Sequence, residues 1–286
     1  MSRRFLRRRG RALLLALGIA LAQTPGVAAE VPLRLEGDMA QGSLVVGRTA
    51  PDARVRFAGE PVRVSSAGVF LVGFGRDAPR TRRLVVELPD GRRIERSLEI
   101  ARRDYDIQRI DGVEPSKVTP PEDALPRIRE EVRLVREARR RDAERTDFLQ
   151  DFRWPVTGRI TGVYGSQRFY NGEPRRPHYG IDIAAPAGTP VRAPATGVVT
   201  LAHPDMYFSG GTLILDHGHG LSSAFLHMRR ISVEQGQRVR RGEVLGEVGA
   251  GGRATGAHLD WRVNLFERRL DPAYLVDPMP GRSATR

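Results

Sequence analysis

The 286-residue sequence contains no cysteine, which excludes disulfide bonds, thiol nucleophiles, cysteine-ligated zinc or iron–sulfur centres and lipoprotein acylation. It also has no run of about 18 apolar residues, which excludes a multi-span helical membrane protein. Aromatic residues make up only 6% of the chain, and Lys117 is the single lysine. Because a nucleic-acid surface interleaves aromatic with basic residues, we expect no nucleic acid as a partner, despite a formal net charge of +13.

The residues that are abundant favour β-structure. The sequence holds 31 glycines and 20 prolines, which mark many turns, and its 40% hydrophobic and 28% charged residues are typical of a globular protein. The length corresponds to one large domain or two ordinary ones after removal of an export segment. We therefore predict a mainly β protein.

The N-terminal residues have the pattern of a secretory signal peptide. Six arginines within residues 1–11 form a positive region, Ala12–Ala22 is a short apolar core, and Val27–Ala29 supplies small residues for cleavage. The apolar core is far shorter than the ~20 residues of a membrane-spanning helix, so we expect no transmembrane anchor after cleavage. The alternative is an amphipathic surface anchor. Cleavage after Ala29 removes six arginines and no acid, leaving a charge of +7. The pattern predicts a signal peptide over 1–29 and a periplasmic or cell-envelope location.

Residues 30–103 are predicted to form a small antiparallel β-sandwich-like domain, because short β-rich runs alternate there with turn residues. Asp90-Gly91 lies between two runs and is a strong hairpin signal. With no histidine and no cluster of catalytic groups, the domain is interpreted as a packing or spacer module, and contact with an envelope protein partner is a second hypothesis for its role. The runs are Val31–Leu35, Gly42–Arg48, Arg54–Gly59, Val69–Phe74, Leu84–Leu88 and Ile94–Ile100.

Residues 104–150 are predicted to be a linker that contains a charged helix over 122–147. The stretch 104–121 has no periodicity, whereas apolar residues then recur at helical spacing. Charged residues cover the remaining positions, so we expect a solvated helix packed on a neighbouring domain. A two-stranded coiled coil is the alternative, but two heptads are too few to establish one. The apolar stripe consists of Leu125, Ile128, Val132 and Val135.

From residue 151 to residue 286 the sequence again predicts β-strands. All six histidines fall within one 81-residue window of this part. His217 and His219 lie in a glycine-rich turn and are expected to face solvent or to form local hydrogen bonds, and His203 lies in a loop. The expected strands are Ile181–Ala184, Gly197–Ala202, Thr212–Asp216, Ser222–His227, Val244–Val248 and His258–Leu265.

Two histidine–carboxylate pairs are candidate metal ligands. His178 precedes a strand that carries Asp182, and Gly180 between them allows a tight entry into the strand. His258 and Asp260 are two residues apart on a strand, so their side chains share a face. His227 ends another strand and is a candidate for proton transfer. Zinc in a cysteine-free exported protein is held by imidazole and carboxylate, and a catalytic site uses three protein ligands.

Seven motifs, taken together and in order, carry a resemblance to a known family. They are Trp154–Gly158, Tyr164–Arg168, His178–Asp182, Gly188–Val191, Leu215–Gly218, Phe225–His227 and Gly256–Asp260. Through them, residues 152–275 resemble the LytM/lysostaphin-type zinc metallopeptidases, which are peptidoglycan endopeptidases. The resemblance implies an antiparallel β-sheet peptidase domain over 151–286 with an open groove, and hydrolysis of peptidoglycan stem peptides or cross-bridges.

The resemblance also implies roles for individual residues. His178 and Asp182 would bind Zn²⁺, and His227 and His258 would be the catalytic histidines. Asp260 departs from the family, which has a histidine there as the third zinc ligand. A carboxylate binds zinc at about the same distance as imidazole, so Asp260 is expected to replace it, although its negative charge would make the zinc-bound water less acidic. The alternative is a decayed site in a non-catalytic LytM-like regulator that activates a cell-wall amidase.

Overall fold

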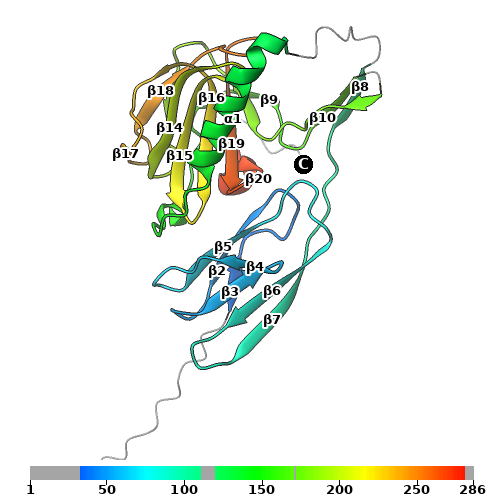
Figure 1. The fold of residues 1–286 in the computed structure, drawn as a ribbon, viewed down its shortest axis with the longest axis vertical. Coiled ribbons are helices and arrows are strands. Elements are labelled where there is room, and N and C mark those ends of the chain that lie inside the picture. The colour runs from blue at the N-terminus through cyan, green and yellow to red at the C-terminus, as the bar shows by residue number, and fades with distance from the viewer. Residues whose placement is uncertain (1–32, 111–119, 171, 281–286) are drawn as a thin grey trace, which may run out of the picture. The chain divides into compact units, whose positions relative to one another are not determined.

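The computed structural model describes residues 33–110, 120–170 and 172–280. The predicted signal peptide lies outside the described residues. Within them no helix is long and apolar enough to cross a membrane. The described chain is mainly β, with antiparallel sheets and one α-helix, which confirms the predicted fold class (Figure 1).

The N-terminal strands form two antiparallel sheets, one in the order β1-β2-β5 and the other in the order β4-β3-β6-β7. Strand β4, which covers Glu60–Val62, was not predicted. Alternation of buried and exposed residues directs Val55 and Phe57 of β3 into a common core with Phe70 and Val72 of β5. The other strands are β1 (Arg34–Glu36), β2 (Leu44–Arg48), β3 (Arg54–Phe57), β5 (Val69–Gly73), β6 (Thr81–Glu87) and β7 (Arg93–Glu99).

The predicted linker contains a strand that local sequence did not reveal. Strand β8 (Ile107–Ile110) pairs in parallel with β10 (Gln167–Tyr170), which pairs in turn with β11 (Glu173–Pro174). The partner of β8 lies far along the chain, and the residues of β8, Ile-Gln-Arg-Ile, show no alternation of apolar and polar side chains. The pairing therefore depends on tertiary context that local periodicity does not report.

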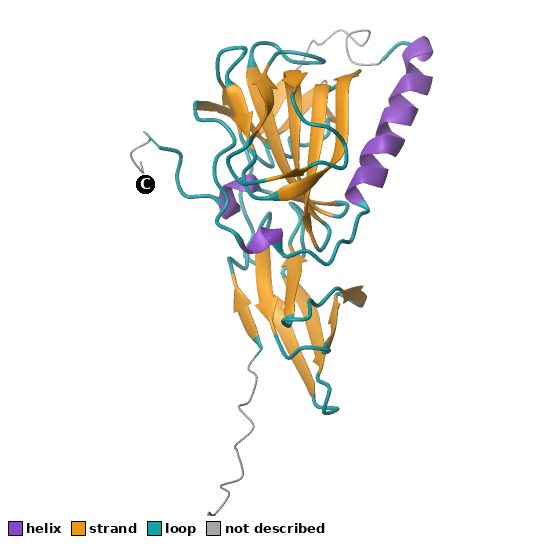
Figure 2. Cartoon of the chain, turned by 90° about the vertical axis from the view of Figure 1, so that its left-hand side faces the viewer, coloured by secondary structure: helices purple, strands orange, loops and turns teal. Residues whose placement is uncertain are grey.

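The predicted helix is present but shorter than expected. A 3-10 turn at Glu122–Ala124 leads into α1, which covers Leu125–Arg139 rather than continuing to Asp147. The residues after the helix bind elsewhere: Arg145 pairs with Asp147 and Asp216, and the Ala143 carbonyl accepts a hydrogen bond from the His219 amide. Helix α1 contacts β14 and β15, where Val135 of the predicted apolar stripe joins a small core, whereas Val132 of the stripe is 50% exposed (Figures 1 and 2).

The C-terminal part is built on one large antiparallel sheet with the path β17-β14-β15-β16-β19-β12-β9. Strands β13, β18 and β20 join it at the sides. Figure 2 shows these strands beside helix α1. The strands are β9 (Arg159–Gly162), β12 (Ile181–Ala184), β13 (Pro190–Arg192), β14 (Gly197–Met206), β15 (Gly210–Gly218), β16 (Leu221–Ile231), β17 (Arg238–Val239), β18 (Val244–Val248), β19 (His258–Leu265) and β20 (Arg268–Leu270).

One side of this sheet is a continuous apolar core in which Trp261, Phe225 and Leu259 are completely buried. Since side chains alternate across a strand, the burial of Leu259 and Trp261 on this side turns His258 and Asp260 of β19 to the opposite face. The core thereby fixes the face on which the candidate site is built. Two 3-10 turns, Asp147–Leu149 and Pro272–Leu275, complete the described elements.

Candidate metal centre and groove

The register of two neighbouring strands brings the candidate metal ligands together. Strands β12 and β19 pair antiparallel, with Asp182 directly opposite Asp260. Opposite residues of an antiparallel pair have Cβ atoms about 4.5–5.5 Å apart on the same face. His178 precedes β12 and reaches the same place. The structure thus assembles the three residues that the sequence proposed as ligands.

The donor atoms of this group have the spacing of a metal site. One donor atom from each of His178, Asp182 and Asp260 can be chosen so that all lie within 4.8 Å of one another. His178 Nε2 lies 3.3 Å from Asp182 Oδ1. Both atoms are buried and accept or donate no hydrogen bond with the described residues. Buried polar atoms without partners are rare and costly. An imidazole nitrogen and a carboxylate oxygen that have no hydrogen-bond partner here are therefore suited to bind a metal ion.

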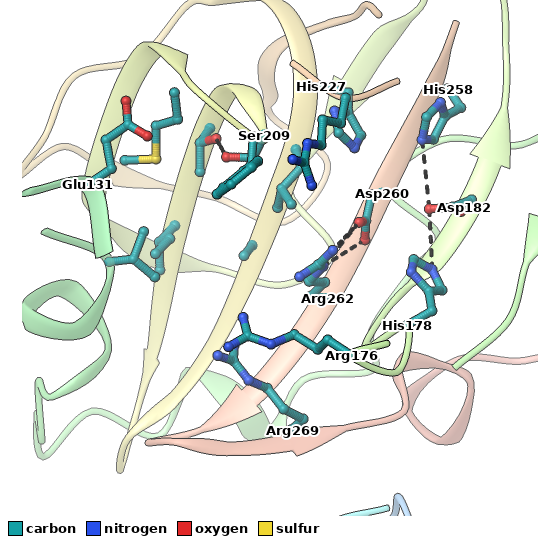
Figure 3. Close-up of a pocket in the computed structure, with 18 of the residues that line it drawn as sticks. Glu131, Arg176, His178, Asp182, Ser209, His227, His258, Asp260, Arg262 and Arg269 are labelled. Atoms are coloured by element: carbon teal, nitrogen blue, oxygen red, sulfur yellow. Dashed lines mark hydrogen bonds and ion pairs between the residues drawn. The ribbon is translucent and has the colours of Figure 1, made fainter. Parts of the chain in front are cut away.

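His227 and His258 lie beside the three candidate metal ligands (Figure 3). The rings of His227 and His258 are 4.7 Å apart between centroids. His227 Nδ1 donates to the Gly251 carbonyl at 2.8 Å, and His258 Nδ1 donates to the Gly256 carbonyl at 2.8 Å. A carbonyl only accepts hydrogen bonds, so the neutral ring of each histidine carries its proton on Nδ1 and keeps a lone pair on Nε2. His258 Nε2 lies 3.8 Å from Asp182 Oδ1.

His227 is held in an uncommon conformation. Its φ of 65° lies in the left-handed region, at the point where β16 changes its partner from β19 to β18. Such backbone is sparsely populated by residues other than glycine and persists where the surrounding structure requires it. Burial lowers the pKa of His227, while its hydrogen bond to Gly251 opposes this shift. The ring is therefore neutral at pH 7 and able to accept a proton.

Asp260 has a partner that the sequence reasoning missed. Arg262 donates to both carboxylate oxygens of Asp260, from Nε at 3.0 Å to each and from its terminal nitrogen at 2.5 Å to Oδ2. Burial opposes the charged form of Asp260, but the charge and hydrogen bonds of Arg262 outweigh it and lower the pKa of this carboxyl. The sequence did contain a signal for this pair, because Arg262 follows Asp260 by two residues and therefore lies on the same face of the strand.

Gly180 makes room for this ion pair. A Cβ at position 180 would collide with Asp260 Oδ1 and with the Arg262 side chain. The glycine predicted to allow a tight entry into β12 thus also permits the close approach of the neighbouring strand's charged side chains.

The centre lies in a cavity of about 870 Å³ that is open to solvent. Strands of the large sheet form its floor, and helix α1 contributes one wall through residues that include Glu131 and Arg139. The helix is anchored beside the cavity by Arg127, which donates to the Asp205 carboxylate, and by Glu131, which accepts from the Tyr207 amide. The sequence predicted that this helix packs on a neighbouring domain, and did not predict that it lines the site.

Of the two expectations for His217 and His219, exposure to solvent is wrong, whereas His217 does form hydrogen bonds, one of them to the nearby Ser223. Both are buried, with exposed fractions of 0% and 3%. His217 bridges the Thr196 carbonyl and Ser223 Oγ, at 2.8 and 2.9 Å, and burial lowers its pKa to about 4. The turn motif gave no sign that residues 141–152 pack over these strands, where Phe148 and Phe152 contact the two imidazole rings. Neither histidine belongs to the metal-type group.

Comparison with known proteins places the chain in a family. The model of peptidase family M23 matches residues 176–272. A solved structure from Pseudomonas aeruginosa, assigned to peptidase M23, superimposes with a TM-score of 0.66 at 32% identity and covers 84% of this chain and 95% of that one. The chain therefore belongs to peptidase family M23, which confirms the resemblance to LytM/lysostaphin-type metallopeptidases.

Two curated relatives each match less than half of the chain. The DD-carboxypeptidase/endopeptidase Mpg of Neisseria meningitidis serogroup B is 40% identical over 125 residues, which are 44% of this chain and 29% of that protein. The peptidoglycan DD-endopeptidase ShyA of Vibrio cholerae is 36% identical over 132 residues, which are 44% of this chain and 30% of that protein. The chain thus spans less than a third of the length of these relatives.

Proposed function

We propose that this protein is an exported zinc-dependent endopeptidase that hydrolyses peptide cross-links of peptidoglycan. The observation that carries the proposal is the group of His178, Asp182 and Asp260, with two histidines beside it in an open cavity. The relatives named as a DD-carboxypeptidase/endopeptidase and a peptidoglycan DD-endopeptidase support the reaction and the polymer. A cavity open to solvent also suits a polymeric substrate.

His178, Asp182 and Asp260 would hold the zinc ion. When bound, zinc supplies a Lewis acid for the scissile carbonyl and lowers the pKa of a bound water. His227 and His258, each with a lone pair on Nε2, would then share the proton transfers. One histidine would take the proton from the attacking water at Nε2 and pass it to the leaving amine, and the other, when protonated at Nε2 by solvent, would donate a hydrogen bond to the oxyanion. Their carbonyl partners, Gly251 and Gly256, hold the rings in the required tautomer.

Arg262 offsets the feature that sets Asp260 apart from its family. An aspartate ligand adds a negative charge that a histidine does not, and on its own it would weaken the metal as a Lewis acid. The Arg262 guanidinium supplies the opposite charge at hydrogen-bond distance. The Asp260–Arg262 pair therefore carries the same net charge as a neutral histidine, which keeps the electrostatic balance of the site near that of a His-Asp-His centre.

The same ion pair favours the second candidate function, a non-catalytic regulator. Three short contacts to Arg262 occupy lone pairs of Asp260 that a metal ion needs. A carboxylate has about four lone-pair directions, so it can bind an arginine and a metal together, and this is the reason we favour the enzyme. If Arg262 instead prevents Asp260 from binding a metal ion, the cavity would bind a protein partner.

Metal analysis of the mature protein, beginning at Glu30, separates the two functions. The enzyme is expected to carry about one zinc ion per chain, to cleave cross-linked peptides, and to stop when the metal is removed by a chelator. The variant Asp182→Ala is the matched control, since it should lose both metal and activity. A parent protein that binds no zinc under the same conditions contradicts the proposal and supports the regulator.

The location in the periplasm or cell envelope forms part of the proposal and rests on the signal-peptide pattern of residues 1–29. N-terminal sequencing should find Glu30 as the first residue of the mature protein. Detection of an intact Met1 on a cytosolic protein would contradict export. Contact of the N-terminal sheets with an envelope protein remains a prediction.

A further inference from the structure

Four arginines converge on one side of the candidate metal centre. Arg139 comes from helix α1, Arg176 from the segment before His178, and Arg262 and Arg269 from strands β19 and β20. All four line the same cavity. Figure 3 shows the Arg176 and Arg269 guanidinium groups next to each other, beside the Arg262–Asp260 pair.

Arg139 is the least compensated member of this group. Its side chain is buried, with 7% of the residue exposed, and its Nε has no hydrogen-bond partner in the part of the chain that the structure describes. Burial, followed by the positive charges of Arg269, Arg262 and Arg176, lowers its pKa well below the ordinary value. A buried guanidinium nitrogen without a hydrogen-bond partner is costly, so the position of Arg139 beside like charges needs an explanation.

The surrounding acids do not balance the cluster. Asp260 is already paired with Arg262. Glu267 lines the cavity and acts on Arg139 and Arg269 through its charge, but forms no ion pair with either among the described residues. Among the described residues, the one hydrogen bond from Arg269 goes to the neutral side chain of Asn264, at 2.7 Å, and burial together with Arg262 lowers the pKa of Arg269 to about 10. Counting Asp182 and Glu131 as well, four acids and seven arginines line the cavity, so positive charge is in excess there.

We propose that Arg139, Arg176 and Arg269 form an anion subsite that binds a free carboxylate of the peptide substrate. The subsite rests on the proposed function and identifies a carboxylate as the feature of the substrate that these arginines recognise. Guanidinium groups bind carboxylates in a bidentate manner, and a carboxylate would give the Arg139 Nε its missing acceptor. Because Arg176 is two residues from His178 and Arg262 binds Asp260, the subsite adjoins the metal centre. Helix α1 then serves as a wall of the substrate site.

Kinetics with paired substrates test the subsite. Cross-linked peptides released from sacculi are used with their carboxyl groups intact or converted to amides. The holoenzyme variants Arg139→Met and Arg176→Gln should raise KM for the intact peptides about tenfold, with little change in kcat, because one charge-assisted contact is lost. The amidated peptides should be bound weakly by the parent and equally weakly by both variants.

Arg159→Gln is the matched control, because Arg159 lines the same cavity on β9 and is not among the charges that act on Arg139. It should leave the preference for carboxylates unchanged. Equal losses for intact and amidated peptides, or an increase in activity toward both when Arg139 is replaced, would overturn the proposal. The latter result would mean that helix α1 obstructs the groove.

Thermal unfolding provides a readout that does not depend on catalysis. Arg139→Met removes a buried unpaired charge, so without peptide the variant should melt at a higher temperature than the parent. A peptide with free carboxylates should raise the melting temperature of the parent more than that of the variant, at constant ionic strength. Equal increases in both proteins would refute the subsite. If the parent cleaves no peptide at all, the proposed function fails, while this measurement still decides whether the arginines bind a carboxylate.

Discussion

Restoring the family histidine at position 260 should damage the site, because Arg262 would lose its carboxylate. Asp260 is 2% exposed and the Arg262 side chain is 24% exposed. Breaking a buried ion pair by removing one partner costs about 3–5 kcal/mol, and the partial exposure of Arg262 places the expected loss near 2–3 kcal/mol. In Asp260→His, the remaining guanidinium would also repel a metal ion beside it.

We therefore expect Asp260→His alone to lower the free energy of unfolding by about 2–3 kcal/mol. Zinc binding should weaken on the order of 100-fold, because the unpaired guanidinium repels the ion and loss of a metal ligand's partner typically costs about 10–100-fold in affinity. The double variant Asp260→His/Arg262→Met removes the orphaned charge and should recover most of both losses. Urea unfolding and competition with a chelator of known affinity measure the two effects.

A second double variant controls for the loss of positive charge as such. Asp260→His/Arg159→Met removes an arginine that lines the same cavity but does not contact Asp260. It should remain as impaired as Asp260→His. If Asp260→His binds zinc and unfolds like the parent, or if both double variants recover equally, the charge-balancing role of Arg262 is refuted.

Three further predictions concern the neighbouring histidines and carboxylates. His178→Ala and Asp182→Ala should each lose the metal, which elemental analysis of the purified proteins would reveal; unchanged zinc content would contradict the ligand assignment. His227→Ala and His258→Ala should keep the metal and lose roughly 10²–10⁴ in kcat, the usual scale for a positioned acid or base; loss of zinc would make either residue a ligand. His217 is buried in its neutral form with a pKa of about 4, so protonation of the unfolded chain near the ordinary value of about 6.5 favours unfolding, and stability should fall by about 3 kcal/mol between pH 6.5 and pH 4. Urea unfolding at several pH values checks this, and His217→Gln should lose that part of the pH dependence.

Local sequence patterns were sufficient to predict the strands that carry the candidate metal ligands. Strands β18 and β19 have the bounds that the sequence predicted, because their apolar residues alternate or run continuously between clear turn residues. The i, i+2 spacing of His258 and Asp260 and the entry of His178 into β12 follow from strand geometry alone. The family resemblance joined His178, Asp182 and Asp260 into one ligand set, but the pairing of β12 with β19 was not predicted, because spacing does not reveal it.

The features that the sequence did not reveal depend on partners distant in the chain. The burial of His217 requires Phe152 to pack over it, and β8 requires β10 as its partner. Helix α1 ends at Arg139 because the following residues bind other segments, whereas helical propensity alone would extend it. The spacing in the sequence places Arg262 on the same face of β19 as Asp260. Its role as the counter-ion of Asp260 can be recognised only from the distances in the structure.

The central claim is tested most directly by the masses of the products released from purified sacculi by the mature, zinc-loaded protein. The account predicts soluble fragments in which a peptide cross-link has gained one water molecule, absent after chelation and absent with Asp182→Ala. Release of fragments cut in the glycan strands, or no release by a protein that demonstrably holds zinc, would contradict it.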